Sequence, residues 1–389
     1  MTPGARTQAA IDLLDAVIAA ARDNGPAADT LIQRYFATRR YAGSKDRRAV
    51  RELVYAAVRA CGERPDTGRA AMLLLADRDP ALAATFDNST HGPAPVGLDE
   101  ARAKPGVLPV WLGKRMTASG IARPAQEALV ARAPLDLRIN TLLADPEAVA
   151  SELGGERIAG LPAAVRLPGG TDVSTLSGRA EVQDAGSQVV TLAARAEPGR
   201  NIVDLCAGAG GKSLALAAAM NNQGVVLATD TDRGRLSRLP PRAERAGATI
   251  VRTRLLDPGH ELDALADVRG QADTVLIDAP CSGTGTWRRN PEARWRLTPD
   301  RLDRLVATQS RLLDIGAALV RPGGALVYVV CSLLDEEGAG QAAAFATRAG
   351  WMVESLDLPL GRRHGPGWRL DPASDGTDGF FVARLTTPC

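Results

Sequence analysis

The first part of the chain repeats apolar positions at helical spacing. Within residues 5–21, Ile11, Leu14 and Ile18 recur every three or four positions, which is typical of an amphipathic helix. The same pattern predicts further helices over 28–38, 45–61 and 70–75. We therefore expect an all-helical domain over residues 1–86, followed by a linker over 87–109 that is rich in proline, glycine and small polar residues.

The pattern changes after residue 200. Continuous apolar runs now alternate with helical segments, as they do when strands are buried on both faces of a parallel sheet. The runs cover 201–207, 224–230, 248–253, 272–278 and 324–330, and a last one covers 379–385. The spacing predicts a doubly wound α/β domain over 196–389. Before it, a strand at 136–140 and a helix at 145–153 indicate a smaller α+β subdomain over 110–195.

Composition narrows the class of protein. The chain has 389 residues, enough for two or three domains, with 45% apolar and 24% charged residues. No apolar run is long enough to span a bilayer, and the N-terminus has no apolar leader. The five cysteines form no CxxC pair and the three histidines are scattered, so we expect neither disulfides nor a metal site, and a cytoplasmic location.

Charge is distributed unevenly along the chain. Residues 1–135 hold 19 lysines and arginines against 14 aspartates and glutamates, and the remainder holds 28 against 31. A basic first third favours an anionic partner, although ordinary surface variation gives the same imbalance. Lysine is rare, and Lys212 is the only one after residue 114.

A glycine-rich loop follows the first strand of the α/β domain, as DLCAGAGGKS over 204–213. A phosphate-binding P-loop would need glycine where Cys206 stands, so that interpretation fails by one residue. A nucleoside site needs an acid at the end of the next strand to hold the ribose, and Asp230 provides it. Asp257 follows the third strand, where it faces an adenine edge or only starts a turn before Pro258.

Two cysteines follow neighbouring strands. Asp278 and Cys281 lie in DAPCSGTG after the fourth strand, and Cys331 ends the fifth in VVCS. Carbon-5 of a pyrimidine is a poor nucleophile, and a thiolate that adds to carbon-6 activates it toward a methyl donor. Asp278 is placed to hydrogen-bond ring nitrogen-3, and a second cysteine would assist release of the product. A lone strand-end cysteine is more often a packing residue, as we expect for Cys206.

These motifs, together with QDAGSQ (183–188) and DGFF (378–381), resemble the Sun-family RNA cytosine-C5 methyltransferases of the RsmB type over residues 105–389. The helices around 44–59 are similar, more weakly, to the NusB-like RNA-binding module of that subgroup. The resemblance implies a seven-stranded Rossmann-like class I methyltransferase sheet whose last strand is antiparallel, and S-adenosylmethionine as cofactor. It implies Cys331 as the nucleophile, Cys281 as the residue that releases the product, and Asp278 as a catalytic acid. The candidate cofactor-binding residues are Asp204, Cys206, Ala207, Gly208, Ala209, Gly210, Gly211, Lys212, Asp230, Arg235, Asp257 and Asp278.

The chain departs from the family where Ala209 replaces a common proline and Val330 a common threonine. Three alternatives therefore stay open. In a DNA cytosine methyltransferase, Cys281 would be the nucleophile. An RNA-binding ribosome-assembly factor would have lost catalysis. The substrate would otherwise be transfer RNA rather than ribosomal RNA.

The segment after Cys281 mixes arginines with tryptophans, as WRRNPEARWR over 287–296. Such a mixture suits phosphate contact and stacking on an unpaired base, and the alternative is a charged loop with its tryptophans packed inward. The expected RNA contacts are Trp287, Arg288, Arg289 and Arg294. We expect RNA, most of all ribosomal RNA, as the partner, no membrane or metal, and a monomer.

Overall fold

The computed structural model describes residues 1–387, and the chain divides into two compact units. The first unit contains Met1–Arg132 and a second stretch, Thr286–Thr298. The second unit contains Ala133–Gly285 and the described chain from Pro299 onward. The sequence-based boundaries at 86, 109 and 195 differ from this division, because the first unit continues to Arg132 and takes up a piece of the chain from the α/β region.

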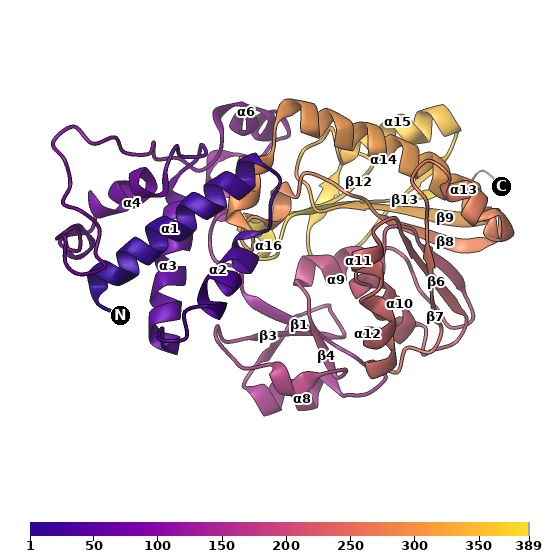
Figure 1. Ribbon diagram of the computed structural model, residues 1–389. Coiled ribbons are helices and arrows are strands. Elements are labelled where there is room, and N and C mark those ends of the chain that lie inside the picture. The colour runs from indigo at the N-terminus through magenta and orange to yellow at the C-terminus, as the bar shows by residue number, and fades with distance from the viewer. Residues whose placement is uncertain (388–389) are drawn as a thin grey trace. The chain divides into compact units, whose positions relative to one another are not determined.

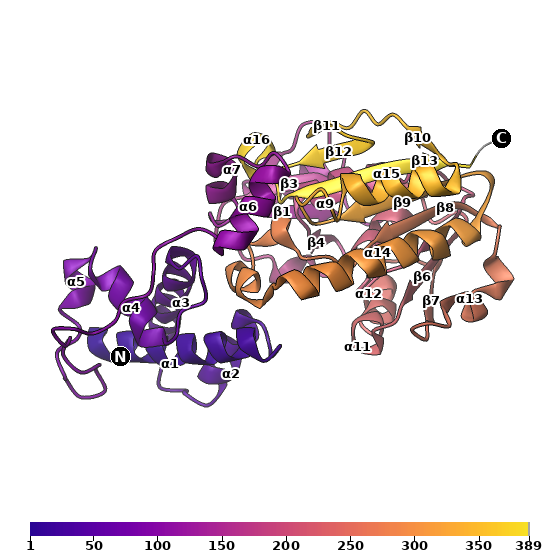
Figure 2. The same cartoon turned by 90° about the horizontal axis from the view of Figure 1, so that it is seen from above.

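The first unit is built from helices. Its longest helix, α1, starts at Pro3, with the Thr2 side chain accepting a hydrogen bond from the Ala5 amide at 3.1 Å. Val17, Val54 and Val58 are fully buried between α1 and α3, which cross in Figure 2. The four helices predicted from periodicity are confirmed to within two residues. The helices are α1 (Pro3–Arg22), α2 (Ala28–Ala37), α3 (Ser44–Ala60), α4 (Gly68–Ala76), α5 (Pro80–Ala83), α6 (Val110–Ala118) and α7 (Arg123–Ala128).

The returning stretch adds a 3₁₀ helix, η4 (Pro291–Arg296), to this helical core. Arg294 is fully buried and donates to the carbonyl oxygens of Val58 at 2.6 Å and Cys61 at 2.8 Å, at the C-terminal end of α3. These carbonyls lack partners within the helix, so the guanidinium caps α3. Glu292 is also buried and accepts from the Ala28 amide at 3.0 Å, at the start of α2. One short segment thus caps two helices of the first unit.

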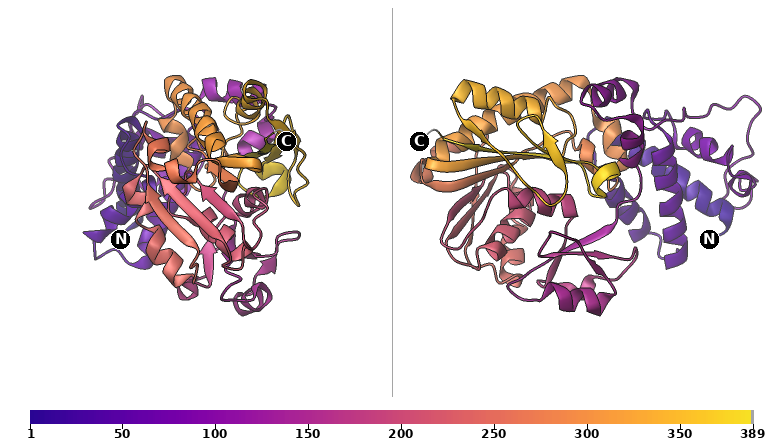
Figure 3. Two further views of the ribbon diagram at one scale, coloured as in Figure 1. Left: turned by 90° about the vertical axis from the view of Figure 1, so that its right-hand side faces the viewer. Right: turned by 180° about the vertical axis from the view of Figure 1, so that it is seen from behind.

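The second unit contains two separate sheets, of which the smaller is antiparallel (Figure 3). Its strand order is β2-β3-β1-β4. Leu137 and Ile139 point from β1 toward Val149 of α8 and form a small core. Helix α8 begins at an Asp-Pro pair and ends at Gly154, whose φ of +61° suits a left-handed C-cap. The elements are β1 (Leu135–Ile139), α8 (Pro146–Leu153), β2 (Glu156–Arg157), β3 (Ala164–Leu167), η1 (Ser174–Leu176) and β4 (Ala180–Val182).

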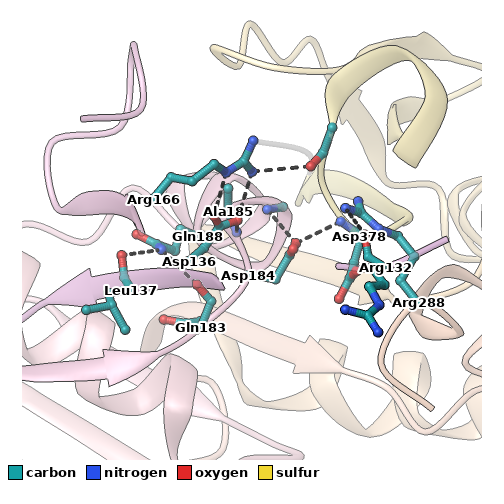
Figure 4. A network of polar contacts seen from close by, with 12 residues as sticks. Arg132, Asp136, Leu137, Arg166, Gln183, Asp184, Ala185, Gln188, Arg288 and Asp378 are labelled. Carbon is teal, nitrogen blue, oxygen red and sulfur yellow. Dashed lines mark hydrogen bonds and ion pairs between the residues drawn. The ribbon is translucent and has the colours of Figure 1, made fainter. Parts of the chain in front are cut away.

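The opposite face of β1 joins the small sheet to helix α9 (Ala185–Leu192) (Figure 4). The buried carboxylate of Asp136 accepts both arms of Arg166, at 2.7 and 3.0 Å, and the Ala185 amide at 3.2 Å. Asp184 caps α9 and also accepts from the Asp378 amide at 3.0 Å. The QDAGSQ and DGFF motifs of the sequence therefore lie side by side and hold the start of α9.

The larger sheet has nine strands in the order β11-β12-β13-β9-β8-β5-β6-β7, and β10 pairs with β13. Strands β7, β6, β5, β8 and β9 are parallel, and β13 is antiparallel to β9. The strands are β5 (Asn201–Asp204), β6 (Val225–Asp230), β7 (Val251–Leu255), β8 (Ala272–Asp278), β9 (Val320–Val330), β10 (Met352–Glu354), β11 (Arg362–His364), β12 (Gly367–Leu370) and β13 (Phe380–Thr386).

Helices cover both faces of this sheet, as Figure 1 shows, with α14 and α15 on one side and α9 to α12 on the other. Apolar residues alternate between two cores: Ile277 and Tyr328 face α14, while Leu276 and Val327 face α9 and α10. The helices are α10 (Gly211–Ala219), α11 (Arg233–Leu236), α12 (Leu239–Arg245), α13 (Glu261–Ala264), η2 (Ala266–Val268), η3 (Thr284–Thr286), α14 (Pro299–Leu319), α15 (Ala339–Ala349) and α16 (Pro372–Asp375).

The expected doubly wound α/β fold is therefore present, but the predicted count of seven strands is corrected to nine. The β11–β12 hairpin escaped prediction because its strands are short and include three arginines and a glycine. Within residues 1–387, no helix has the length and apolar character of a membrane span. Over the same residues, no group of three or more histidine, cysteine, aspartate or glutamate side chains is arranged to hold a metal ion.

Candidate active site

The glycine-rich loop connects β5 to α10 and is shaped by two residues with positive φ. Gly208 has φ +56° and Gly210 has φ +86°. A Cβ at Gly210 would overlap Leu239, and one at Gly208 would overlap the guanidinium of Arg235. Only glycine meets both demands at these positions. The carbonyl of Ala209 accepts a hydrogen bond from Arg242, so the loop keeps its shape without the proline common in the family.

Asp230 ends β6 beside this loop. Its two carboxylate oxygens accept from the backbone amides of Gly208 at 2.7 Å and Asp232 at 2.8 Å. Each oxygen keeps a further lone pair for a hydroxyl donor. A carboxylate fixed at this position, next to a glycine loop at the carboxyl edge of a parallel sheet, suits the ribose of a nucleoside.

Asp204 is fully buried at the end of β5. Its Oδ2 accepts from Ser213 at 2.6 Å, and its Oδ1 has no hydrogen-bond partner among residues 1–387. Burial raises the pKa of Asp204 to about 7, although the Ser213 hydrogen bond opposes this. An orphaned carboxylate oxygen beside the loop fits a cationic group of a bound cofactor.

We expect Asp204 to destabilise the unliganded protein as the pH rises. Its pKa is 3.8 in the unfolded chain and about 7 when folded, so stability present below pH 3.8 is lost as the pH rises through 7. The loss is on the order of 4 kcal/mol. Asp204→Asn should remove this pH-dependent loss of stability, because the asparagine cannot ionise and its amide oxygen still accepts from Ser213. Urea unfolding of variant and parent at pH 5 and pH 8 measures the effect. An unchanged difference between the two pH values would contradict it, and Asp303→Asn on the exposed face of α14 is the control.

Two cysteines meet at the ends of β8 and β9. The Sγ atoms of Cys281 and Cys331 are 3.3 Å apart, and neither cysteine is in a disulfide. The Gly285 amide donates to the carbonyl of Cys331 at 3.0 Å and holds the Cys281 loop against β9. Val330 stands where threonine is common in the family. It is fully buried in the apolar core, and this position does not require a hydroxyl. The structure thus brings together the two cysteines that the sequence singled out.

Lys212 and Asp278 form an ion pair beside these cysteines, with 2.6 Å between Nζ and Oδ2. Burial lowers the pKa of Lys212, but attraction to Asp278 and to Cys331 outweighs burial, so the pKa is raised. The Asp278 side chain is about one-third exposed at 32%, whereas that of Lys212 is 9% exposed. The lysine is therefore fixed as a cation, and the aspartate is the more accessible partner.

The surroundings of Cys206 and Asp257, two of the expected cofactor residues, match the alternative interpretation of each. Cys206 packs against the apolar core, and burial raises the pKa of its thiol well above the ordinary value, so it stays neutral. Asp257 is exposed, and its carbonyl accepts from the His260 amide at 2.9 Å across a turn in which Gly259 has φ +89°. Asp257 therefore begins a turn, which was its alternative interpretation. Ala207 and Gly211 lie within the loop as expected.

The expected RNA contacts need correction at two residues. Trp287 and Arg294 are both fully buried, and the Arg294 guanidinium is used by the carbonyls of α3, so neither side chain is accessible to RNA. Arg288 is 8% exposed and donates to the Arg132 carbonyl at 3.3 Å, and Arg289 is partly buried. Alternation of arginine with tryptophan predicted a surface loop, but a guanidinium also satisfies helix C-terminal carbonyls in a core.

Sequence analysis missed a group of polar residues behind the cysteines: Ser282, Thr284, Gln309, Ser332 and Glu337. The available signal was the Cys-Ser pair that occurs twice, at 281–282 and 331–332, with an acidic stretch after the second pair. Polar residues that are buried need hydrogen-bond partners, and Ser282 and Ser332 share one in Glu337.

The description 16S rRNA methyltransferase RsmB/F matches residues 189–386, which is half of the chain. The chain belongs to the RsmB/F methyltransferase family. Over 270 residues it is 36% identical to a probable ribosomal RNA small subunit methyltransferase B of Synechocystis sp., covering 64% of this chain and 59% of that protein. Over 290 residues it is 36% identical to the ribosomal RNA small subunit methyltransferase B of Xanthomonas campestris pv. campestris, covering 71% and 66%.

The aligned part of the chain thus spans about three-fifths to two-thirds of the length of these relatives. Among solved structures, the crystal structure of PH0851 has the same fold, with a TM-score of 0.76, 24% identity and coverage of 100% of this chain and 99% of that one. The cofactor of this family member is S-adenosylmethionine. This cofactor fits the glycine loop, the Asp204 oxygen that has no partner among residues 1–387, and the Asp230 carboxylate.

Proposed function

We propose that this chain methylates carbon-5 of a cytosine in RNA, with 16S ribosomal RNA as the substrate, through a covalent bond between Cys331 and carbon-6 of the base. The observation that carries the proposal is the 3.3 Å contact between Cys281 and Cys331, beside the Lys212–Asp278 pair. A methyltransferase that acts on an already nucleophilic atom needs no thiol, whereas carbon-5 needs one. A second thiol in contact with the first suits a reaction that must also expel the first.

Each side chain has a definable part in this reaction. The Cys331 thiolate adds to carbon-6, and Asp278 holds the polar edge of the ring while the electron pair moves toward carbon-5. S-adenosylmethionine supplies the methyl group that carbon-5 takes up. Once Cys331 is bonded to carbon-6, the Cys281 thiol loses its proton to solvent and its thiolate takes up the proton from carbon-5. The electrons of that carbon–hydrogen bond form the double bond to carbon-6 and expel Cys331 as a thiolate. Lys212 stays a cation throughout and stabilises negative charge on Asp278 and Cys331.

The first unit offers a surface for RNA on helices α2 and α3. Its exposed basic residues are Arg34, Arg40, Lys45, Arg47, Arg48 and Arg51, with Tyr41 exposed at 74% among them. The acid within this stretch, Asp46, is neutralised by the N-terminal amine at 3.1 Å and by Arg6 at 2.8 Å. Arg48 is paired with Glu52 at 3.3 Å, but basic residues outnumber acidic ones over 34–52. Surplus arginines beside an accessible ring suit phosphate contact and base stacking. This surface takes the place of Trp287 and Arg294 among our candidates for RNA contact, while Arg288 and Arg289 remain among them.

Transfer of label from tritiated S-adenosylmethionine tests the proposed function. The substrates are 16S ribosomal RNA, small ribosomal subunits, transfer RNA and genomic DNA from a strain that lacks the gene. We expect labelled 5-methylcytosine in the ribosomal RNA. Label in transfer RNA alone would change the substrate, label in DNA would favour the DNA-type mechanism, and no label despite cofactor binding would favour the RNA-binding assembly factor.

Asp230 provides a separate test of the cofactor site. Asp230→Ala removes the carboxylate proposed to hold the ribose, and two charge-assisted hydrogen bonds are each worth about 1.5 kcal/mol or more. We expect S-adenosylmethionine to bind about 100-fold more weakly by calorimetry, with Asp303→Ala, at an exposed acid of α14, as the comparison. Equal affinity of Asp230→Ala and the parent would place the ribose elsewhere.

A further inference from the structure

A buried carboxylate lies behind the two cysteines. Glu337 is fully buried, and its carboxylate receives hydrogen bonds from four donors. Oε1 accepts from the Ser282 amide at 2.8 Å and from Gln309 Nε2 at 3.0 Å. Oε2 accepts from Ser332 Oγ at 2.5 Å and from Ser282 Oγ. Four donors satisfy an ionised carboxylate, which only accepts hydrogen bonds.

The partners of Glu337 are the residues next to the cysteines. Ser282 follows Cys281 after β8, and Ser332 follows Cys331 after β9. Thr284 adds a contact to Ser332 at 3.0 Å and accepts from the Leu333 amide at 2.9 Å. One side chain therefore ties together the two loops that carry the cysteines, and so fixes the contact between the two sulfur atoms.

The charges around the pair are arranged asymmetrically. The hydrogen bond to Cys331 and burial raise the pKa of Cys281 well above its ordinary value, and the negative charge of Glu337 raises it further. On the other side, the ammonium of Lys212 is attracted to Cys331. The other titratable groups near the pair are Asp204, Cys206, Asp278 and Tyr328. The geometry has the same asymmetry, because Glu337 accepts two hydrogen bonds from Ser282, next to Cys281, and one from Ser332, next to Cys331.

We propose that Glu337 is a positioning residue that determines which of two touching cysteines becomes the thiolate, keeping Cys281 protonated and leaving the negative charge to Cys331. A thiolate is the attacking species, so this division makes Cys331 the nucleophile and Cys281 a hydrogen-bond donor to it. The roles named here rest on the proposed function. The distribution of charge between the two sulfur atoms does not, because it exists without RNA.

The test is site-resolved alkylation of the RNA-free, full-length protein by iodoacetamide. Each thiolate forms a thioether and releases iodide, and mass spectrometry reports the rate at each cysteine. In the parent, Cys331 should react faster than Cys281. Glu337→Gln keeps the size of the side chain but removes its charge, and should raise the rate at Cys281 about tenfold near neutral pH. Glu336→Gln, which removes a neighbouring charge, should leave both rates unchanged.

Two further measurements protect the test against a variant that fails to fold. Cys61 is fully buried in the first unit, so its alkylation reports unfolding of that unit, and circular dichroism of each variant reports the fold of the second. The Cys281→Ala and Cys331→Ala proteins, with Glu337 intact, should ionise in a fixed order, Cys331 at the lower pH. The proposal is overturned if Cys281 ionises first, or if folded Glu337→Gln changes both rates equally.

Failure of this proposal and failure of the proposed function give different results. If no RNA is methylated but Glu337→Gln alters the cysteine selectivity as expected, the proposed function fails and the role of Glu337 stands. If RNA is methylated and selectivity does not respond to Glu337→Gln, the role of Glu337 fails alone.

Discussion

Cys281→Ala protein incubated with substrate RNA and S-adenosylmethionine should accumulate as a covalent protein–RNA complex that migrates slowly in a denaturing gel. The variant keeps the Cys331 thiol that forms the adduct but lacks the thiol that assists its release, which lies 3.3 Å away. Multiple turnover should fall by about 100- to 10,000-fold, which is the usual cost of losing a group that acts in proton transfer. The measurement is the fraction of protein shifted in the gel and its loss on nuclease treatment.

The matched variants are Cys331→Ala, which should form no complex and transfer no methyl group, and Cys206→Ala, which should behave as the parent in the gel. Trapping by Cys331→Ala with none by Cys281→Ala would exchange the two roles and restore the DNA-type mechanism. A protein with both active-site cysteines replaced should form no complex in either case.

Arg294→Ala should destabilise the first unit by about 3 to 5 kcal/mol, the cost of removing one partner of a buried charged interaction. The guanidinium is fully buried, and burial lowers its pKa to about 10. Its loss leaves the Val58 carbonyl without its donor, leaves the Cys61 carbonyl with the Trp295 indole at 3.2 Å, and opens a cavity at the end of α3. Hydrogen exchange at the amides of α3 should accelerate strongly, and urea unfolding should begin at a lower concentration.

Two controls separate this effect from loss of charge. Arg294→Lys keeps the charge but not the forked donors, and should recover part of the stability. Arg48→Ala removes an arginine whose side chain is 81% exposed, and should change stability by less than about 0.5 kcal/mol. Equal protection of α3 in Arg294→Ala and the parent would show that the cap contributes nothing.

The long helices and buried parallel strands were predictable because their apolar periodicity is strong. The strand at 272–278 is apolar enough to be recognised without its neighbours, and it ends at Asp278 as expected. Strands β11 and β12 were not predictable, since Arg362 and Arg369 carry no pattern until they pair with each other across the hairpin.

The residues of the candidate active site also divide into those that could be predicted from the sequence and those that could not. The glycine loop and both cysteines have local signals, and the carboxyl edge of a parallel sheet brings such residues together. Glu337 has only a weak local signal, the acidic stretch after the second Cys-Ser pair, because its role depends on Ser282, which is 55 residues away in the chain. The prediction that Arg294 contacts RNA was wrong for a related reason. Its local pattern is typical of a surface, while its hydrogen-bond partners lie 233 and 236 residues earlier in the chain.

The return of residues 286–298 to the first unit has a consequence for how the protein can be divided or recombined. The chain passes between the units three times, so no single junction separates them. A fragment that starts at Ala133 would retain η4 but lose α2 and α3, whose ends that segment caps. Gene fusions that exchange the first unit for a different domain must therefore also replace residues 286–298, immediately after the Cys281 loop. No single cut in the gene separates the coding sequences of the two units.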